Sequence, residues 1–317
     1  MTEATCIIGA SGFIGGKTLA RLLREPEAGS VRVLVHRSPV DPHPGMNSVQ
    51  GDASDLDSLE RLLDLEAVVL NFAYGGEGAG ERVARALGTA CARRGVRRLV
   101  HVSTCSVYGT TSGQVIDEAS PCAPATAYER AKRAVEEVLQ AEAHGRYELV
   151  ILRPTAVFGP GGKNLETLAL RVLRQSWPRR YLRACAMGRR RMHAVDVECV
   201  AAAVLFLASA PLEAPVERFI VSQDDEPMND YRSIEAFLVR RFGAAPYPLA
   251  PVAPPPFLLS AGLRLAGRSV TDPLRSYSAA KLASCGFRRP RGFQDALEEY
   301  AGWLEQRETG QATHARA

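Results

Sequence analysis

A tyrosine and a lysine lie four residues apart, at Tyr128 and Lys132, in a segment with helical periodicity over 126–143. Residues at this spacing share one face of a helix. A free tyrosine hydroxyl has a pKa of about 10, and a neighbouring ammonium group favours the phenolate and lowers that pKa. The pair therefore predicts a group that exchanges a proton with a carbonyl oxygen near neutral pH.

Hydroxyl side chains precede this helix in the segment VSTCSVYG at 102–109, which follows a predicted strand over 97–103. A hydroxyl here could hold the oxygen of a substrate carbonyl by a hydrogen bond. The same Y-x-x-x-K spacing recurs at Tyr277 and Lys281, in a C-terminal region far in sequence from the predicted sheet. We therefore assign the chemistry to Tyr128 and expect a structural role for Tyr277.

Three glycines, Gly9, Gly12 and Gly15, lie between a predicted strand over 5–9 and a predicted helix over 14–25. Glycine permits a positive φ and a close approach of backbone to a pyrophosphate, and the helix N-terminus offers free N–H groups to the anion. A tight strand–helix turn without a ligand has the same pattern, but the position after the first apolar strand favours dinucleotide binding. Together with the tyrosine and lysine, the turn predicts a redox enzyme in which a nicotinamide transfers hydride and Tyr128 handles the proton.

The second predicted strand, over 31–36, ends where the adenosine ribose of a dinucleotide is expected. An acidic residue there would accept the 2′-hydroxyl of NAD, but this chain has His36 and Arg37. A guanidinium group can pair with a 2′-phosphate, so we favour NADP(H) over NAD(H); a solvated loop arginine is the alternative. Asp52 is placed to meet the adenine edge, or else it is a turn or helix-cap carboxylate.

Strand and helix patterns alternate through the first 150 residues of the 317-residue chain. Alternation with unbroken apolar strands is typical of a parallel sheet covered on both faces, so we predict an α/β fold with a Rossmann-type doubly wound parallel sheet and a smaller, mostly helical C-terminal substrate domain. Besides those already given, the predicted strands are 66–71, 147–153 and 218–221, and the predicted helices are 55–64, 79–94 and 196–209. Residues 164–183 are expected to be helical and then irregular. We expect the NAD(P)-binding domain to comprise 1–160 with about 192–225, the substrate-binding domain 161–191 with 226–306, and a disordered tail 307–317.

Charge and composition exclude several functions. Eight arginines and no acid lie between Thr167 and Val195, but the net charge is only +4 and aromatic groups are few, so we expect a solvated surface with one or two diphosphate contacts and no nucleic-acid binding. His193 has no partner at metal-ligand spacing, so we expect it to be structural or to line the pocket, and no metal is predicted.

Seven cysteines without a C-x-x-C pair favour reduced thiols and a cytoplasmic location. No apolar run reaches the roughly 18 residues of a membrane span. The segment 257–263 could lie on a membrane, although packing against its own domain is the commoner use.

Six motifs together resemble the extended short-chain dehydrogenase/reductase superfamily, in its branch of NAD(P)-dependent sugar-nucleotide epimerases and dehydratases. The motifs are GASGFIG at 9–15, VSTCSVYG at 102–109, IDEASP at 116–121, YERAK at 128–132, LRPTAVFGP at 152–160 and MHAVDV at 192–197. The resemblance implies a catalytic triad of Thr104, Tyr128 and Lys132. It also implies a homodimer that packs through the helices at 79–94 and 126–143.

The resemblance and the residue patterns together give the predicted binding residues. Cofactor contacts are expected from Gly9, Ser11, Gly12, Phe13, Ile14, Gly15, Arg37, Asp52, Ala53, Phe72, Ala73, Tyr74, Tyr128, Lys132, Pro154 and Thr155. Substrate contacts are expected from Thr104, Ser106, Ala156 and Arg189.

Two departures from the family pattern shape the functional hypothesis. Ala156 stands where family epimerases often carry an asparagine that contacts the nucleotide sugar, and Arg37 fits NADPH better than a retained NAD. We therefore expect an NADPH-dependent ketoreductase acting on a keto-sugar nucleotide or related glycosyl intermediate. The alternatives are a redox-neutral NAD-dependent sugar-nucleotide epimerase and a reductase of a non-sugar ketone, such as a steroid or secondary metabolite. A cofactor-sensing regulatory protein could dispense with Tyr128 and Lys132, so their presence counts against that class.

Overall fold

The structure, a computed structural model, describes residues 4–25, 29–74, 78–188, 190–252, 255 and 273–314. Within these residues seven strands form one sheet in the order β10-β7-β5-β4-β1-β2-β3, and every neighbouring pair is parallel. The strands are β1 (Thr5–Ile8), β2 (Val31–Val35), β3 (Met46–Gln50), β4 (Val68–Asn71), β5 (Arg98–Val102), β7 (Glu148–Pro154) and β10 (Val216–Val221). The predicted doubly wound α/β fold is confirmed, and β3 is a strand that the sequence did not predict.

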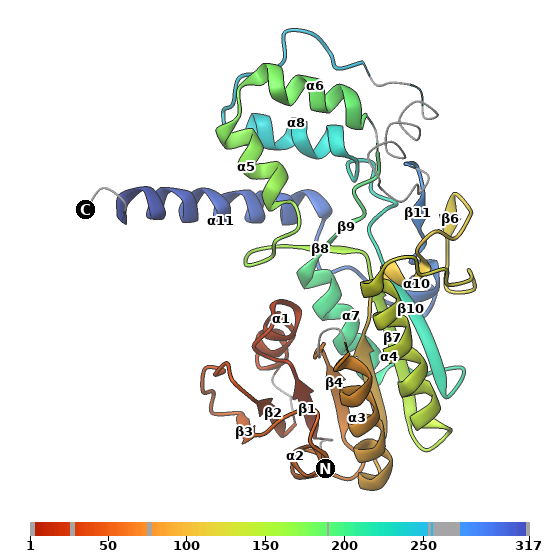
Figure 1. Cartoon of the computed structure of the whole chain (residues 1–317). Helices are drawn as coiled ribbons and strands as arrows, with labels where there is room; N and C mark the ends of the chain where they lie inside the picture. Colours follow the sequence, from red (N-terminus) through yellow and green to blue (C-terminus); the bar gives the residue numbers. More distant parts are fainter. Residues whose placement is uncertain are drawn as a thin grey trace.

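Helices cover both faces of the sheet (Figure 1). On one face lie α1 (Phe13–Leu22) and α7 (Val197–Ser209), and on the other α2 (Leu56–Leu62), α3 (Gly80–Arg94) and α4 (Ala127–Ala143). Successive strand residues point to opposite faces, so Ile7 belongs to the core beneath α1 and α7 while Ile8 belongs to the core beneath α2, α3 and α4. This two-sided burial explains why the strands read as unbroken apolar runs.

A third hydrophobic core lies beyond the sheet, among α5 (Glu166–Arg174), α6 (Trp177–Met187), α8 (Tyr231–Arg241) and α11 (Phe293–His314) (Figure 1). Phe158 reaches it from the short strand β8 (Ala156–Phe158), with its ring centroid 5.6 Å from that of Phe293. β8 pairs with β9 (Ala194–Asp196), which leads directly into α7. The division of the chain into the two predicted domains stays a prediction.

A partly buried ion pair joins this third core to the sheet. Asp196, at the start of α7, is almost inaccessible and accepts hydrogen bonds from Arg291 at 2.6 and 2.8 Å. Arg291 lies just before α11, so the pair ties the beginning of that helix to the helix that covers the sheet. Two parallel guanidinium–carboxylate bonds fix both position and orientation.

Helix α11 runs to His314, so the disordered tail expected from residue 307 is wrong over 307–314. Arg307 donates to Glu166 of α5 at 2.6 Å, which fastens this part of the helix to its neighbour. None of the helices in the part of the chain that the structure describes is long and apolar enough to cross a membrane. The segment 257–263 lies outside the described residues.

The helix α4 is anchored to the sheet through a buried carboxylate. Glu136 is fully inaccessible and pairs with Arg153 of β7 at 2.6 Å, and it also accepts a hydrogen bond from the Ser103 hydroxyl at 2.6 Å. The Arg153 guanidinium lies 4.8 Å from the centre of the Tyr108 ring. One carboxylate thus fixes the position of α4 relative to both β7 and the segment after β5.

We predict that Glu136→Gln lowers the free energy of unfolding by about 3–5 kcal/mol, because it leaves the buried Arg153 charge without a counterion. Urea unfolding measures the effect. The matched control is Glu137→Gln, which breaks only the exposed pair with Arg133 and should cost less than about 0.5 kcal/mol. Equal stability of the two variants would contradict the anchoring role.

Candidate active site

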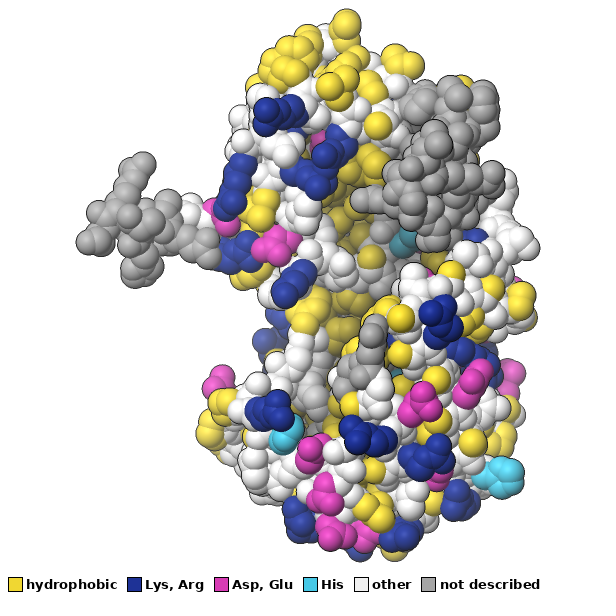
Figure 2. Space-filling view, viewed as in Figure 1, with side chains coloured by type: hydrophobic (Ala, Val, Ile, Leu, Met, Phe, Trp, Pro, Cys, Tyr) yellow, Lys and Arg dark blue, Asp and Glu magenta, His cyan; other side chains and the backbone are white. Residues whose placement is uncertain are grey.

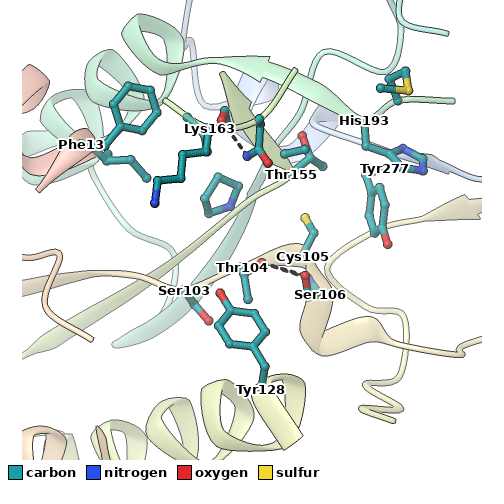
Figure 3. A pocket seen from close by; sticks show the side chains of 16 residues that line it. Phe13, Ser103, Thr104, Cys105, Ser106, Tyr128, Thr155, Lys163, His193 and Tyr277 are labelled. Carbon is teal, nitrogen blue, oxygen red and sulfur yellow. Dashed lines mark hydrogen bonds between the residues drawn. The ribbon is translucent and has the colours of Figure 1, made fainter. Parts of the chain in front are cut away.

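A cavity of about 530 Å³ opens at the carboxyl ends of β5 and β7, beside the first turn of α4 (Figure 3). Segments far apart in the sequence meet there: the turn into α1, the segment after β5, the end of β7, the segment before β9, and β11 (Ser276–Tyr277). Eight of the predicted site residues line it: Phe13, Ile14, Thr104, Ser106, Tyr128, Pro154, Thr155 and Ala156.

Tyr128 lies in the first turn of α4, and its hydroxyl points into the cavity toward Thr104 (Figure 3). The turn is held by a capping box, in which Thr126 accepts from the Glu129 N–H at 3.2 Å and Glu129 accepts from the Thr126 N–H at 3.0 Å. The Thr104 side chain lies close enough to the Tyr128 hydroxyl to favour the phenolate. The predicted pairing of a phenol with a nearby hydroxyl is therefore present in the structure.

Thr104 is held in place by its own local structure. It caps the short 3-10 helix η1 (Cys105–Tyr108), where its oxygen accepts from the Ser106 N–H at 3.1 Å. Its hydroxyl donates to the Ser106 Oγ, also at 3.1 Å. These contacts keep two hydroxyls together at the floor of the cavity.

Lys132 lies one turn beyond Tyr128 but is buried, with 7% of its surface exposed, and its Nζ lies 4.3 Å from the centre of the Tyr74 ring. Burial lowers the pKa of Lys132 to about 8, although the neighbouring Glu136 opposes the change. Burial also raises the pKa of Tyr128, as does Tyr74, and both outweigh the opposing effect of Thr104. A lowering of the Tyr128 pKa by Lys132 therefore stays a prediction; in this structure the ammonium group lies against Tyr74.

The glycine turn has the geometry of an anion cradle. Gly9 has φ of +84° and its carbonyl accepts from the Gly12 N–H at 3.1 Å, while a Cβ on Gly15 would lie 2.2 Å from the Gly9 oxygen. Gly12 is the N-cap of α1 and supplies no side chain to the first turn of the helix. The N–H groups there are therefore left for an external anion, which fits the pyrophosphate of a dinucleotide.

A second cavity of about 520 Å³ lies on the other side of this turn, at the ends of β1, β2 and β4. It is lined by seven predicted cofactor residues: Gly9, Ser11, Arg37, Asp52, Ala53, Ala73 and Tyr74. The turn between the two cavities would hold the pyrophosphate, so the pair of cavities has the layout that an extended dinucleotide requires.

Two polar side chains in this second cavity were predicted to choose or hold the cofactor. Asp52 accepts from the Ser54 N–H at 2.8 Å and from its hydroxyl at 3.0 Å, and these bonds hold the pKa of Asp52 below its usual value. It is thus a turn carboxylate that also faces the cavity. Arg37 is exposed at the rim, within range for its charge to act on Asp52.

Several predicted contacts lie elsewhere. Phe72 packs against the core beneath α1 and α7, and Lys132 is buried behind Tyr74. Gly12 and Gly15 shape the turn without lining either cavity. Arg189 lies outside the described residues.

Two arginines of the arginine-rich segment illustrate its internal contacts. Arg180 is buried and donates to the Ala245 carbonyl at 2.7 Å, and Arg174 pairs with Glu308. Figure 2 shows that positive side chains are scattered over the visible face, with acidic groups between them in its lower part.

Sequence reasoning missed part of the cavity wall. Tyr277 lines the cavity because β11 pairs with β6 (Val115–Ile116), which brings the C-terminal region to the site. Lys281 does not accompany it, since its Nζ pairs with Glu217 of β10 at 2.8 Å. His193 lines the cavity, one of the two roles expected of it, but its partner was missed: its Nδ1 lies 2.7 Å from Oδ2 of Asp224. Asp224 carried no recognisable signal in the sequence, because its partner lies 31 residues away.

Comparison with known families agrees with this geometry. The profile of the NAD dependent epimerase/dehydratase family matches residues 5–221. The chain belongs to this family. A dTDP-glucose 4,6-dehydratase from Streptomyces niveus is 29% identical over 181 residues, which cover 49% of this chain and 54% of that protein. The match thus spans about half the length of that relative. The resemblance to sugar-nucleotide epimerases and dehydratases is confirmed.

Solved structures of similar fold include epimerases and dehydratases. The dTDP-glucose 4,6-dehydratase from Bacillus anthracis in complex with NAD has a TM-score of 0.74 at 16% identity and covers 97% of this chain and 98% of its own. The Bordetella bronchiseptica enzyme WbmG, in complex with NAD and UDP, has a TM-score of 0.71 at 20% identity, with 95% and 94% covered. A UDP-glucose 4-epimerase from Thermotoga maritima, with UDP-glucose, has a TM-score of 0.70 at 18% identity, with 96% and 99% covered. At these identities the likeness shows the fold.

We predict that Lys132→Met stabilises the protein, stripped of cofactor, at pH 7. The pKa of Lys132 is about 8 in the folded chain against 10.5 ordinarily, which corresponds to roughly 3 kcal/mol of destabilisation at any pH below 8. Loss of the contact with Tyr74 takes back about 1 kcal/mol, so a gain of about 2 kcal/mol is expected.

The size of this stabilisation depends on pH in a defined window. Between pH 8 and 10.5 the unfolded chain keeps the Lys132 proton and the folded chain releases it, so stability rises with pH only in the parent. The advantage of Lys132→Met should therefore shrink as the pH rises from 8 to 10, as measured by urea unfolding. Lys17→Met, which loses a partly exposed pair with Glu198, is the control. A destabilised Lys132→Met at pH 7 would refute the argument.

Proposed function

We propose that this protein is an NADPH-dependent ketoreductase acting on a keto-sugar nucleotide or related glycosyl intermediate. The observation that carries the proposal is the meeting of the Tyr128 and Thr104 hydroxyls in a cavity that adjoins an uncapped glycine turn. A phenol and a hydroxyl around one point suit a carbonyl oxygen, and the turn suits the pyrophosphate of the coenzyme.

The residues would divide the work as follows. A bound nicotinamide supplies the hydride to the carbonyl carbon. Thr104 donates a hydrogen bond to the carbonyl oxygen, and Tyr128 gives that oxygen its proton as the C–O double bond becomes a C–OH single bond. Lys132, held behind Tyr74, would contact the ribose of the coenzyme and favour the phenolate that remains. The coenzyme itself would be held by the glycine turn, Arg37, Asp52 and the residues that end β4.

The polar groups of the cavity favour carbonyl reduction over loss of water. Among its lining residues in the described part of the chain there is no aspartate or glutamate, so the paired carboxylates that suit elimination of a hydroxyl are missing. Lys163 adds a positive charge to the wall, as an anionic substrate requires (Figure 3). The nucleotide-sugar part of the proposal is supported by UDP and UDP-glucose in complexes of similar fold.

A redox-neutral sugar-nucleotide epimerase with retained NAD is the second candidate. The complexes of similar fold that contain NAD favour it. Against it stands Arg37 at the rim of the second cavity, where a 2′-phosphate would lie. Ala156, which lines the first cavity, also leaves room for a non-sugar ketone.

We further propose a cytoplasmic homodimer. The support for dimerisation is that α3 and α4 lie side by side on one face of the sheet, packed closely enough that a Cβ on Gly88 would lie 2.3 Å from Glu142 (Figure 1). Together they offer a continuous helical surface to a second copy. Seven thiols without a disulfide suit a reducing compartment.

We predict that Tyr128→Phe lowers kcat for reduction of a keto-sugar nucleotide by about 10²- to 10⁴-fold, because it removes the proton donor. NADPH binding, measured by nicotinamide fluorescence, should change less than about 2-fold. The control is Tyr300→Phe, which removes a buried hydroxyl in the third core. A Tyr128→Phe enzyme with the parental rate would refute the assignment.

We predict that Arg37→Ala weakens NADPH binding by about 10- to 100-fold, the value of one charge-assisted hydrogen bond, and weakens NADH binding by less than about 3-fold. Titration calorimetry with both coenzymes measures the ratio. Arg93→Ala, on α3 away from both cavities, should leave the ratio unchanged. An equal loss for both coenzymes in Arg37→Ala would overturn the preference for NADP(H).

A further inference from the structure

The structure assigns a second proton-transfer site to the same cavity. We propose that His193, oriented by Asp224, removes the proton from the carbon next to the substrate carbonyl, so that the protein catalyses hydrogen exchange at that carbon in addition to reduction. This inference rests on the proposed function, because the carbonyl compound must first bind at Tyr128 and Thr104. It adds an activity that hydride transfer alone does not require.

The first support is the geometry of the histidine. Nδ1 of His193 lies 2.7 Å from Oδ2 of Asp224, and the two side chains are 26% and 1% exposed. An ionised carboxylate can only accept a hydrogen bond, so the proton of the neutral ring lies on Nδ1 and the lone pair lies on Nε2. No side chain or backbone group in the described residues is bonded to Nε2, so this atom is available to a ligand.

The second support is the isolation of the Asp224 charge. Its oxygens accept from the Tyr277 N–H at 2.9 Å and from the Asn229 amide at 3.3 Å. Within the described ranges no arginine or lysine forms an ion pair with it, and the His193 ring is the basic group bonded to it there. A buried carboxylate in this position compensates the positive charge that an imidazole gains when it takes a proton.

The third support is the placement of His193 in the cavity. It lies across the cavity from Tyr128, with Thr104 and Ser106 between them (Figure 3). Its backbone is held, because the His193 carbonyl accepts from the Ala156 N–H at 2.8 Å. The edge of its ring packs on Tyr277, with centroids 5.1 Å apart. A base fixed on one wall thus faces a carbonyl site fixed on the other.

The chemistry follows from these positions. A carbonyl whose oxygen is hydrogen-bonded to Tyr128 and Thr104 acidifies the hydrogen on the adjacent carbon. As that C–H bond breaks, Nε2 of His193 takes the proton, the electron pair forms a C–C double bond, and the former carbonyl oxygen becomes the enolate oxygen. Return of a proton to the carbon restores the ketone. The cycle is redox-neutral, and its trace is a solvent hydrogen at that carbon.

The test uses the whole chain with dTDP-4-keto-6-deoxyglucose and its UDP counterpart as probes. Exchange is measured in D₂O without NADPH, by mass spectrometry and against a blank without enzyme, and reduction is measured separately with NADPH. We expect exchange above the blank in the parent. We expect His193→Gln to lower exchange at least 100-fold, and by at least 30-fold more than it lowers reduction.

Two further variants complete the design. Asp224→Asn should lower exchange at least 10-fold more than reduction, because the amide cannot compensate an imidazolium charge. His144→Gln, which changes a histidine at the C-terminal end of α4 outside both cavities, is the matched control and should leave the ratio of exchange to reduction unaltered.

The outcomes separate the two proposals. If the parent reduces a probe but shows no exchange above the blank, or if His193→Gln lowers both reactions equally, the second site is overturned while the ketoreductase proposal stands. If the parent performs neither reaction, the proposed function fails and this inference fails with it.

Discussion

The buried pair between Glu136 and Arg153 is the contact on which the site depends. Tyr128, Lys132 and Glu136 follow one another at intervals of four residues, so they share one face of α4. The last of them is locked to β7 and to Ser103, and this lock sets where the other two can lie. A helix placed by surface packing alone could slide or rotate, whereas a fully desolvated ion pair tolerates little displacement.

The same face of α4 carries an energetic conflict. Lys132 lies on α4 between Tyr128 and Glu136 and is buried there. Its lowered pKa reflects the free energy that this burial costs. The Tyr128 pKa is raised as well, so neither group is set for proton transfer by its protein neighbours alone. The ribose and nicotinamide of a coenzyme would supply the missing polar environment. The burial of Lys132 thus lowers the stability of the ligand-free protein, because the site is arranged for a bound coenzyme.

The sequence predicted those parts of the structure that local patterns encode. Parallel strands buried on both faces are continuous apolar runs, so β1, β4, β5 and β7 were visible as strands, and the glycine turn followed from its position. β3 was missed because its sequence, MNSVQ, is polar and its residues at the sheet edge are largely exposed. The tail beyond 306 was expected to be disordered because no local pattern shows what holds it. Arg307 pairs with Glu166, which is distant in sequence and comes near only after the chain has folded.

The residues of the cavity wall show the same limit of prediction from local sequence patterns. Tyr128 and Thr104 were found from spacing within and just before one helix. Tyr277 was set aside because it lies far from the sheet in sequence, yet pairing of β11 with β6 brings it to the site. Asp224 and His193 meet only through the arrangement of β9 and β10, so no pattern along the chain could join them. The raised pKa of Tyr128 also follows from its burial in the fold and from Tyr74, which comes from a different strand end.

The bidentate bond between Arg291 and Asp196 has a consequence for how ligands come and go. It fastens the start of α11 to the start of α7 through a carboxylate that is almost inaccessible to water, so the helical region and the sheet resist separation as two halves. We expect coenzyme and substrate to pass through the open mouths of their cavities, with turnover limited by side-chain and loop rearrangement. An enzyme built in this way would keep nearly the same overall dimensions in solution whether empty or loaded.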